Sequence, residues 1–131
     1  TAAAQRAEKL MTDGGSMLTM TYYGAEKVMP NYNVMGVAKA ALEASVQYLA
    51  VDLGPKNIRI NGVAPGATRT DALESVLNPE VKKTMLQHTP IHRLGEAQDM
   101  ANAALFLCSP AASWVSGQIL TVSGGGVQEL D

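Results

Sequence analysis

The sequence predicts an α/β fold with about three parallel strands and flanking helices. Stretches rich in helix formers alternate along the chain with short apolar runs of strand length, which is the pattern of β-α-β units joined by right-handed crossovers. The 131 residues suffice for one domain and not for two. A hydrophobic content of 47% against 17% charged residues allows a packed core and argues against intrinsic disorder.

The first half of the chain is predicted to contain a helix, a strand and a long helix. Residues 2–11 are rich in helix formers, and Asp13-Gly14-Gly15 ends that helix. The short apolar run at 16–21 is predicted to be a strand. From about 33 to 53, apolar residues recur in steps of three or four, which predicts a helix that is apolar on most of its sides. We expect a sheet and a second helix to cover it. The apolar stripe consists of Val34, Ala38, Leu42, Val46, Leu49 and Leu53.

The second half is predicted to continue the alternation. A strand over 58–64 ends at Pro65-Gly66. Asn78-Pro79-Glu80 combines a capping side chain, a proline at the first helical position and an acid in the first turn, so a helix is expected from there to about Gln87. A further helix is expected over about 96–107, and a last strand at 118–122.

Composition and charge argue against several classes of partner. Ten Lys and Arg residues against 12 Asp and Glu give a net charge of −2 without a basic stripe, so we expect no nucleic acid and no anionic membrane surface as main partner. No apolar run comes near the roughly 18 residues of a membrane span, and the first residues lack the layout of a signal peptide. The single Cys108 excludes an internal disulfide and suggests a reducing compartment, so a cytoplasmic protein is expected. No metal site is expected, because Pro90 breaks the helix that would align His88 with His92.

Tyr32 and Lys39 are the strongest candidates for chemistry. Seven positions apart, they lie close to one face of a helix, two turns from each other. A nearby ammonium group favours the phenolate, so the pair could serve as a general acid. The alternative is that Tyr32 merely begins a helix and that Lys39 pairs with Glu43 at i,i+4.

The surroundings favour the chemical interpretation. Tyr22-Tyr23-Gly24 follows one predicted strand, Asn61-Gly-Val-Ala-Pro65-Gly66-Ala-Thr68-Arg-Thr70 spans the end of the next, and Val122-Ser-Gly-Gly125 follows the last. In this order the set resembles the second half of a short-chain dehydrogenase/reductase, over essentially the whole chain. The resemblance implies a partial Rossmann-type three-layer fold and makes residues 1–131 one domain that corresponds to the C-terminal half of a member of that family.

Two parts of the chain resemble different branches of the family. Residues ~12–45 resemble bacterial enoyl-acyl carrier protein reductases, whose Tyr-x6-Lys pair and upstream Tyr fall on Tyr32, Lys39 and Tyr22. Residues ~52–131 resemble bacterial 7α-hydroxysteroid dehydrogenases, which use Ser and Tyr-x3-Lys. Position 22 holds Tyr in place of that Ser, Gly36 lies three residues before Lys39, and the Tyr of the second pattern is absent. We infer a chimera with a junction between about residues 41 and 57.

The resemblance implies a role for each matched residue. Tyr32 would donate a hydrogen bond or proton to the substrate carbonyl or enolate oxygen, Lys39 would hold the nicotinamide ribose hydroxyls and support that acid, and Tyr22 would line the substrate pocket. The backbone of Thr68 would bind the nicotinamide carboxamide, Thr70 would reach polar atoms of the cofactor, and residues 71–95 would cover the substrate. The residues expected to bind the cofactor are Lys39, Pro65, Gly66, Ala67, Thr68 and Thr70.

Length also shapes the expectations. Family members are about twice as long, and their first half carries the glycine-rich turn that binds the pyrophosphate. Only five residues follow Gly124-Gly125-Gly126, too few for the helix of such a turn. The cofactor is therefore NAD or NADP by resemblance, with no tight binding expected of this chain alone. Helices 2–11 and 31–53 resemble the pair at the family's dimer interface, so we expect a homo-oligomer or a complementing N-terminal half.

Three functions follow as alternatives. The acid pair favours NAD(P)-dependent reduction of an enoyl thioester, and the longer C-terminal match favours oxidation of a hydroxysteroid. The third alternative is a non-catalytic recombined or designed half-domain that folds and self-associates. Whether this chain alone is an enzyme stays open at this point.

Overall fold

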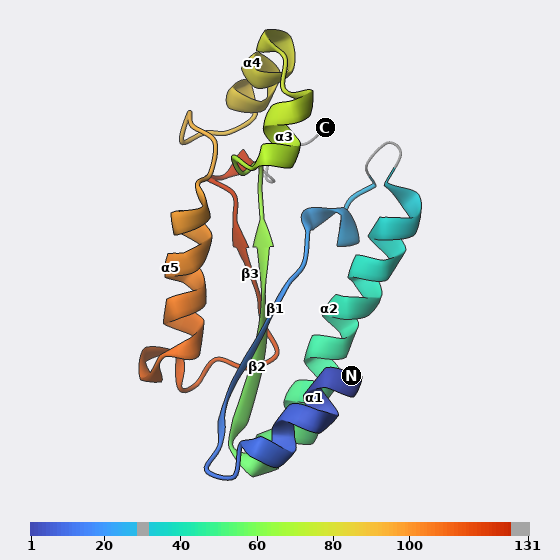
Figure 1. Cartoon of the computed structure of the whole chain (residues 1–131), viewed down its shortest axis with the longest axis vertical. Helices are drawn as coiled ribbons and strands as arrows, with labels where there is room; N and C mark the ends of the chain where they lie inside the picture. Colours follow the sequence, from blue (N-terminus) through green and yellow to red (C-terminus); the bar gives the residue numbers. More distant parts are fainter. Residues whose placement is uncertain (29–31, 127–131) are drawn as a thin grey trace.

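A three-stranded parallel sheet lies at the centre of the molecule (Figure 1). The computed structural model describes residues 1–28 and 32–126. The strands β1 (Gly15–Met20), β2 (Ile58–Pro65) and β3 (Ile119–Val122) follow one another in the order β1-β2-β3, with both pairs parallel. The predicted α/β class, strand number and strand direction are confirmed.

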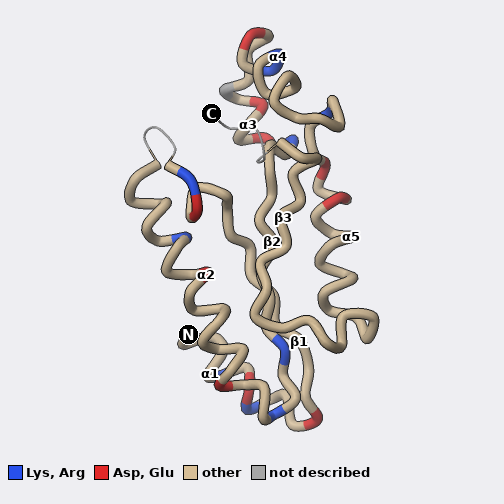
Figure 2. Tube along the Cα trace, turned by 180° about the vertical axis from the view of Figure 1, so that it is seen from behind, with Lys and Arg blue, Asp and Glu red and all other residues tan. Residues whose placement is uncertain are grey.

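The helices form a layer on each side of the sheet. The short α1 (Ala2–Ala7) and the long α2 (Asn33–Leu53) lie on one side, and α5 (Ala97–Cys108) lies on the other, as both views along the chain show (Figures 1 and 2). Strand β2 is central and is covered on both faces, so most of its residues are buried in one nearly continuous run. The core packs Val63 against Met100 and Leu107 of α5.

The remaining helices lie above the carboxyl ends of the strands (Figure 1). α4 (Pro79–Gln87) begins where the sequence predicts, and Asn78 Oδ1 accepts a hydrogen bond from the N–H of Val81 at 2.8 Å. Within residues 71–95, the segment that the resemblance implies would cover the substrate, a second helix forms that the local sequence pattern did not predict, α3 (Asp71–Val76). Its cap is Thr70, whose hydroxyl oxygen accepts from the N–H of Leu73 at 3.2 Å.

Two expectations about the first half need correction. The helix predicted over 2–11 is shorter: α1 ends at Ala7 and continues as the 3-10 turn η1 (Glu8–Leu10). The long helix is not covered on most of its sides, since only Val46 and Leu53 of α2 are buried. Its outer face carries Val34, Val37, Tyr48 and Val51, each exposed to 73–76%.

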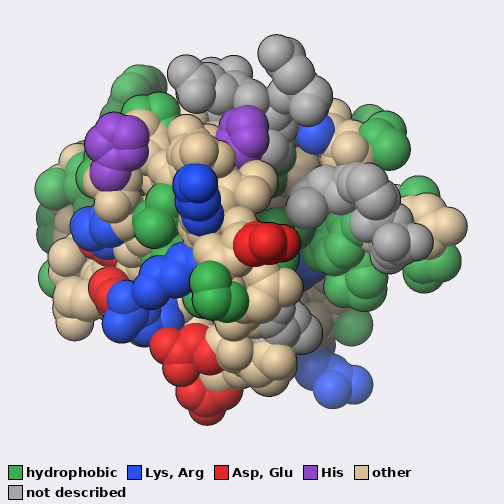
Figure 3. Space-filling model, turned by 90° about the horizontal axis from the view of Figure 1, so that it is seen from above, with side chains coloured by type: hydrophobic (Ala, Val, Ile, Leu, Met, Phe, Trp, Pro, Cys, Tyr) green, Lys and Arg blue, Asp and Glu red, His purple; other side chains and the backbone are tan. Residues whose placement is uncertain are grey.

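The composition of α2 also corrects the view that no segment resembles a membrane span. Residues 33–56 form a helix that is long and apolar enough to cross a membrane by length and composition alone, since an 18-residue window within it has a mean hydropathy of 1.2. Few charged residues mark this helix (Figure 2). Seen from above, hydrophobic side chains lie at both sides of the molecule, the side of α2 included, and acidic and basic side chains are mixed between them (Figure 3).

Candidate functional site

The carboxyl end of β1 and the first half of α2 form the core of the candidate site. Tyr32 is the N-cap residue of α2, and its ring meets that of Tyr22 edge to face, with centroids 5.4 Å apart and planes at 64°. Burial raises the pKa of the Tyr22 phenol, and the neighbouring Tyr32 raises it further. The Tyr22 phenol therefore loses its proton at a higher pH than an ordinary tyrosine does.

Lys39 reaches the same strand end. Its Nζ donates a hydrogen bond to the carbonyl oxygen of Met20 at 3.2 Å. The alternative partner Glu43 is engaged elsewhere, because its Oε1 accepts from the Thr21 hydroxyl at 2.6 Å. The alternative Lys39–Glu43 ion pair does not form: no contact within 4.0 Å joins the charged groups of these two described residues. Among the residues 1–28 and 32–126, no carboxylate forms a salt bridge with Lys39.

Three consecutive residues at and just after the end of β1 therefore each contact a residue of α2 or its N-cap. Met20 contacts Lys39, Thr21 contacts Glu43, and Tyr22 contacts Tyr32. The contact between Thr21 and Glu43 could not be predicted from the sequence, because no local signal joins residues that lie 22 positions apart. The three contacts fix how the helix that carries Tyr32 and Lys39 sits on the strand end.

Gly36 allows α2 to approach the preceding turn closely. A Cβ atom at this position would lie 2.8 Å from the carbonyl oxygen of Gly24, in the 3-10 turn η2 (Tyr23–Ala25). The Tyr of a Tyr-x3-Lys pattern would precede Lys39 by four positions, where this chain has the half-exposed Met35. Tyr32, seven positions before Lys39, is the tyrosine from the start of α2 that packs on Tyr22 after the end of β1.

The loop after β2 forms the second part of the site. The N–H of Gly66 donates to the carbonyl of Val122 at 2.9 Å, and the Thr68 hydroxyl donates to the carbonyl of Gly66 at 3.0 Å. A parallel bridge joins Thr68 to Gly95: the N–H of Gly95 donates to Ala67 at 2.9 Å and that of Arg69 donates to Gly95 at 2.8 Å. In this arrangement the N–H and C=O of Thr68 itself have no hydrogen-bond partner within the described part of the chain.

Those two free groups suit a carboxamide. An amide offers an N–H donor and a C=O acceptor, which complement one backbone acceptor and one backbone donor. β1 and β2 are neighbouring parallel strands, so the Tyr22–Tyr32–Lys39 group and the Thr68 loop lie at the same edge of the sheet. Ligands bind at that edge in open α/β sheets. Within residues 1–28 and 32–126, no three His, Cys, Asp or Glu side chains gather as metal ligands.

The chain is similar to known proteins over nearly its whole length. A family model described as enoyl-(acyl carrier protein) reductase matches residues 1–126. A 7α-hydroxysteroid dehydrogenase of Escherichia coli K12 is 64% identical over 118 residues, which are 90% of this chain and 46% of that protein. An NADH-dependent enoyl-[acyl-carrier-protein] reductase of Rhizobium meliloti is 50% identical over 126 residues, which are 95% of this chain and 46% of that protein.

Solved structures lead to the same group of enzymes. A 7α-hydroxysteroid dehydrogenase complexed with NADH and 7-oxoglycochenodeoxycholic acid superposes with a TM-score of 0.87 at 62% identity, over 98% of this chain and 49% of that one. The Bacillus cereus enoyl-acyl carrier protein reductase with NADP+ and an indole naphthyridinone gives a TM-score of 0.89 at 42% identity, over 98% of this chain and 51% of that one. The chain spans about half the length of these relatives. It belongs to the enoyl-(acyl carrier protein) reductase family of short-chain dehydrogenases/reductases.

Proposed function

We propose that this chain forms the substrate-side half of an NAD(P)-dependent oxidoreductase, in which Tyr32, Lys39 and Tyr22 carry the chemistry. The observation that carries the proposal is the set of contacts between the end of β1 and α2. These contacts bring the Tyr22–Tyr32 ring pair and the Lys39 ammonium group to one strand end. The relatives with NADH or NADP+ in their names support the coenzyme class.

Each residue has a defined task in this proposal. The Tyr32 hydroxyl donates a hydrogen bond or a proton to the substrate carbonyl or enolate oxygen, where negative charge develops. Lys39 has donors left after its bond to Met20, since an ammonium group has three, and these bind the ribose hydroxyls. The raised pKa of Tyr22 keeps this phenol neutral as a wall of the substrate pocket.

The loop after β2 completes the coenzyme site. The free N–H and C=O of Thr68 bind the nicotinamide carboxamide, and Pro65, Gly66 and Ala67 give the loop its course past the end of β3. Thr70 uses its hydroxyl oxygen as the cap of α3 and keeps the hydroxyl hydrogen for a polar atom of the coenzyme. When bound, the nicotinamide supplies the hydride donor or acceptor that the side chains of this site lack.

Two substrate classes are candidates. The Tyr22, Tyr32 and Lys39 pattern supports an enoyl thioester, as in the enoyl reductases. The 64% identity to a steroid enzyme supports a hydroxysteroid. Steady-state turnover of a crotonyl thioester against that of a bile-acid alcohol, with NADH or NADPH or the oxidised forms, distinguishes the two. Tyr32→Phe removes the acid and should lower turnover at least about a hundredfold; unchanged turnover would show that Tyr32 is not the acid.

A third function, association without catalysis, rests on the uncovered apolar surface. We propose a homo-oligomer through α1 and α2, or a complementing N-terminal half that adds to the free edge of β1. An apolar cleft of about 410 Å³ between α1, β1 and α2 supports this surface as an interface. Light scattering after gel filtration tests it: a stable monomer at micromolar concentration would contradict the oligomer. Titration calorimetry with NADH and NADPH tests the coenzyme site, and no heat at millimolar coenzyme would leave association as the function of this chain alone.

A further inference from the structure

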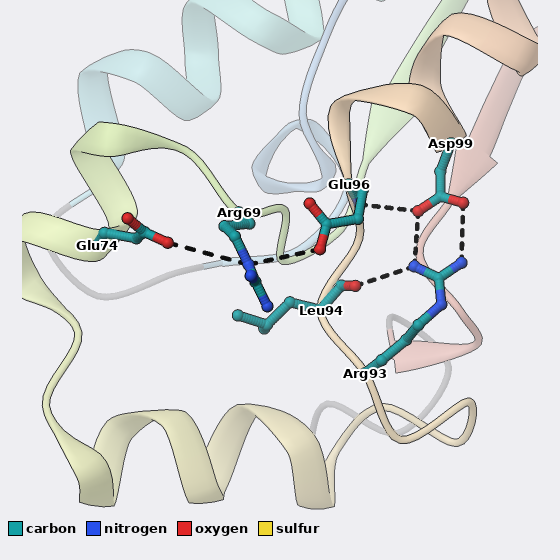
Figure 4. Close-up of polar contacts among 6 residues, drawn as sticks. All are labelled: Arg69, Glu74, Arg93, Leu94, Glu96 and Asp99. Atoms are coloured by element: carbon teal, nitrogen blue, oxygen red, sulfur yellow. Dashed lines mark hydrogen bonds and ion pairs between the residues drawn. The ribbon is translucent and has the colours of Figure 1, made fainter.

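Two charged residues, Arg93 and Asp99, line one cavity with Ala67 and Gly95, beside the Thr68 loop. Arg93 and Asp99 form a two-pronged ion pair: Nη1 donates to Oδ2 at 2.7 Å and Nη2 donates to Oδ1 at 2.8 Å (Figure 4). Such paired, charge-assisted hydrogen bonds fix the relative orientation of both groups. Arg93 Nη1 also donates to the carbonyl of Leu94 at 3.0 Å, shortly before α5 begins.

Asp99 at the same time fixes the start of α5. Its Oδ2 accepts from the backbone N–H of Glu96 at 2.8 Å, as half of a capping box. One carboxylate thus holds the chain at residue 93 through the guanidinium and at residue 96 through the backbone. The pKa of Asp99 is lowered to about 2, first by the hydrogen bond from Arg93 and then by that from Glu96. Asp99 is therefore ionised, and able to accept both hydrogen bonds, through the neutral and mildly acidic range.

Gly95 lies between these two fixed points and carries the bridge to the loop after β2. It exchanges one hydrogen bond with Ala67 and one with Arg69, so it holds the backbone on both sides of Thr68. A Cβ atom on Gly95 would lie 3.1 Å from the Thr68 hydroxyl oxygen, which shows how closely the two segments pack. The Arg69–Glu96 contact at 3.4 Å spans the same gap, but both side chains are at least half exposed, so it adds little.

We propose that Arg93 and Asp99 are positioning residues for the coenzyme loop: they fix Gly95 and, through it, hold residues 66–70 so that the N–H and C=O of Thr68 stay free for a ligand. This inference rests on the proposed function for the identity of the ligand, but the hold on the loop can be measured without any ligand. Neither residue contacts the coenzyme in this proposal.

Amide hydrogen exchange by NMR on the whole chain tests the hold. In Arg93→Gln and Asp99→Asn we expect the protection of the Arg69 and Gly95 amides to fall by roughly tenfold. Asp99→Asn keeps an oxygen for the N–H of Glu96, so it removes the ion pair without removing the helix cap. Arg93→Lys keeps the positive charge but can make only one of the two hydrogen bonds to Asp99. It should therefore show more amide protection than Arg93→Gln and less than the unmodified chain. Lys56→Gln is the matched control, because it breaks the Lys56–Glu8 pair of 3.0 Å far from the loop.

Each outcome decides the proposal. A local loss of protection at residues 69 and 95, with α5 and the sheet unchanged, supports it. Unchanged protection in both variants overturns it, and so does an equal loss throughout α5 and the sheet, which would make the pair a general stabiliser. NADH titration of the same proteins is the second measurement: a weaker affinity in the variants at unchanged melting temperature supports the positioning role. If the unmodified chain binds no NADH, the proposed coenzyme site fails for this chain, whereas the exchange data still decide whether Arg93 and Asp99 hold the loop.

Discussion

The contact between Thr21 and Glu43 should be essential for the position of α2 on the sheet. Thr21 is 5% exposed, and its hydroxyl donates to the Glu43 carboxylate at 2.6 Å. Thr21→Val keeps the shape of the side chain and removes this donor. A hydrogen bond to a charged group contributes about 1.5–3 kcal/mol, and because Glu43 is partly accessible to water, we expect a loss of free energy of unfolding near the lower limit of about 1.5 kcal/mol. In a chain of this size that corresponds to a decrease in Tm of roughly 5–7 °C.

A double-mutant cycle isolates this contact. Urea unfolding of Thr21→Val, Glu43→Ala and the double variant gives the coupling energy, which should exceed about 0.5 kcal/mol. Ser45→Ala is the control on the same helix, because the Ser45 hydroxyl donates only to the carbonyl of Ala41 one turn earlier, at 2.8 Å. If Thr21→Val is no more destabilising than Ser45→Ala, or if the two single changes add within about 0.3 kcal/mol, the contact does not anchor α2 and the reasoning is refuted.

Three further predictions concern single groups. Gly36→Ala gains helix propensity of about 1 kcal/mol, but its Cβ would lie 2.8 Å from the Gly24 carbonyl, so we expect a net loss of stability in urea unfolding; a more stable variant would contradict this close approach. The lowered pKa of Asp99, about 2, makes its contribution to stability complete above its unfolded value of about 4 and lost as the pH falls through 2. Acid unfolding of Asp99→Asn should therefore be less steep between these pH values than that of the unmodified chain, and equal slopes would show that Asp99 is not involved. Because the pKa of Tyr22 is raised in the folded state, the neutral phenol favours folding below the ordinary tyrosine pKa, and this stability is lost as the pH rises through the higher folded value. An ultraviolet titration should therefore show one phenol that titrates later than the others and that Tyr22→Phe removes.

The elements of the fold follow largely from local sequence signals. Asn78-Pro79 marks the start of α4, and the regular apolar steps mark α2, because capping and amphipathicity act over a few residues. The six residues of α3 gave no such periodic signal and were missed. The cover expected over α2 was wrong, since an apolar helix face indicates that a partner surface is needed but not that the same chain provides it.

The candidate site could be predicted in part. Family resemblance located Tyr22, Tyr32, Lys39 and the loop around Thr68, and these remain proposals for catalysis and coenzyme binding. Spacing alone suggested a Lys39–Glu43 pair, but the tertiary contact with Thr21 takes Glu43. The chimera with a junction between residues 41 and 57 also stays a prediction. Both kinds of enzyme match nearly the whole chain, the steroid enzyme at 64% identity over 118 residues and the enoyl reductase at 50% over 126, so neither match marks a junction.

The central strand has a consequence for the order in which the chain folds during synthesis. Asn61 is fully buried and binds both the carbonyl of Val115, at 2.9 Å, and the N–H of Gln118, at 3.0 Å. Arg59 on the same strand donates to carbonyls at the end of α5, from Leu107 and Ser109. These polar groups have no partner until residues more than 45 positions later have left the ribosome. The pairing of β1 with β2 can form early, but the other edge of β2 is covered only by residues 119–122, so a nascent chain stalled before them would expose this strand to association with others.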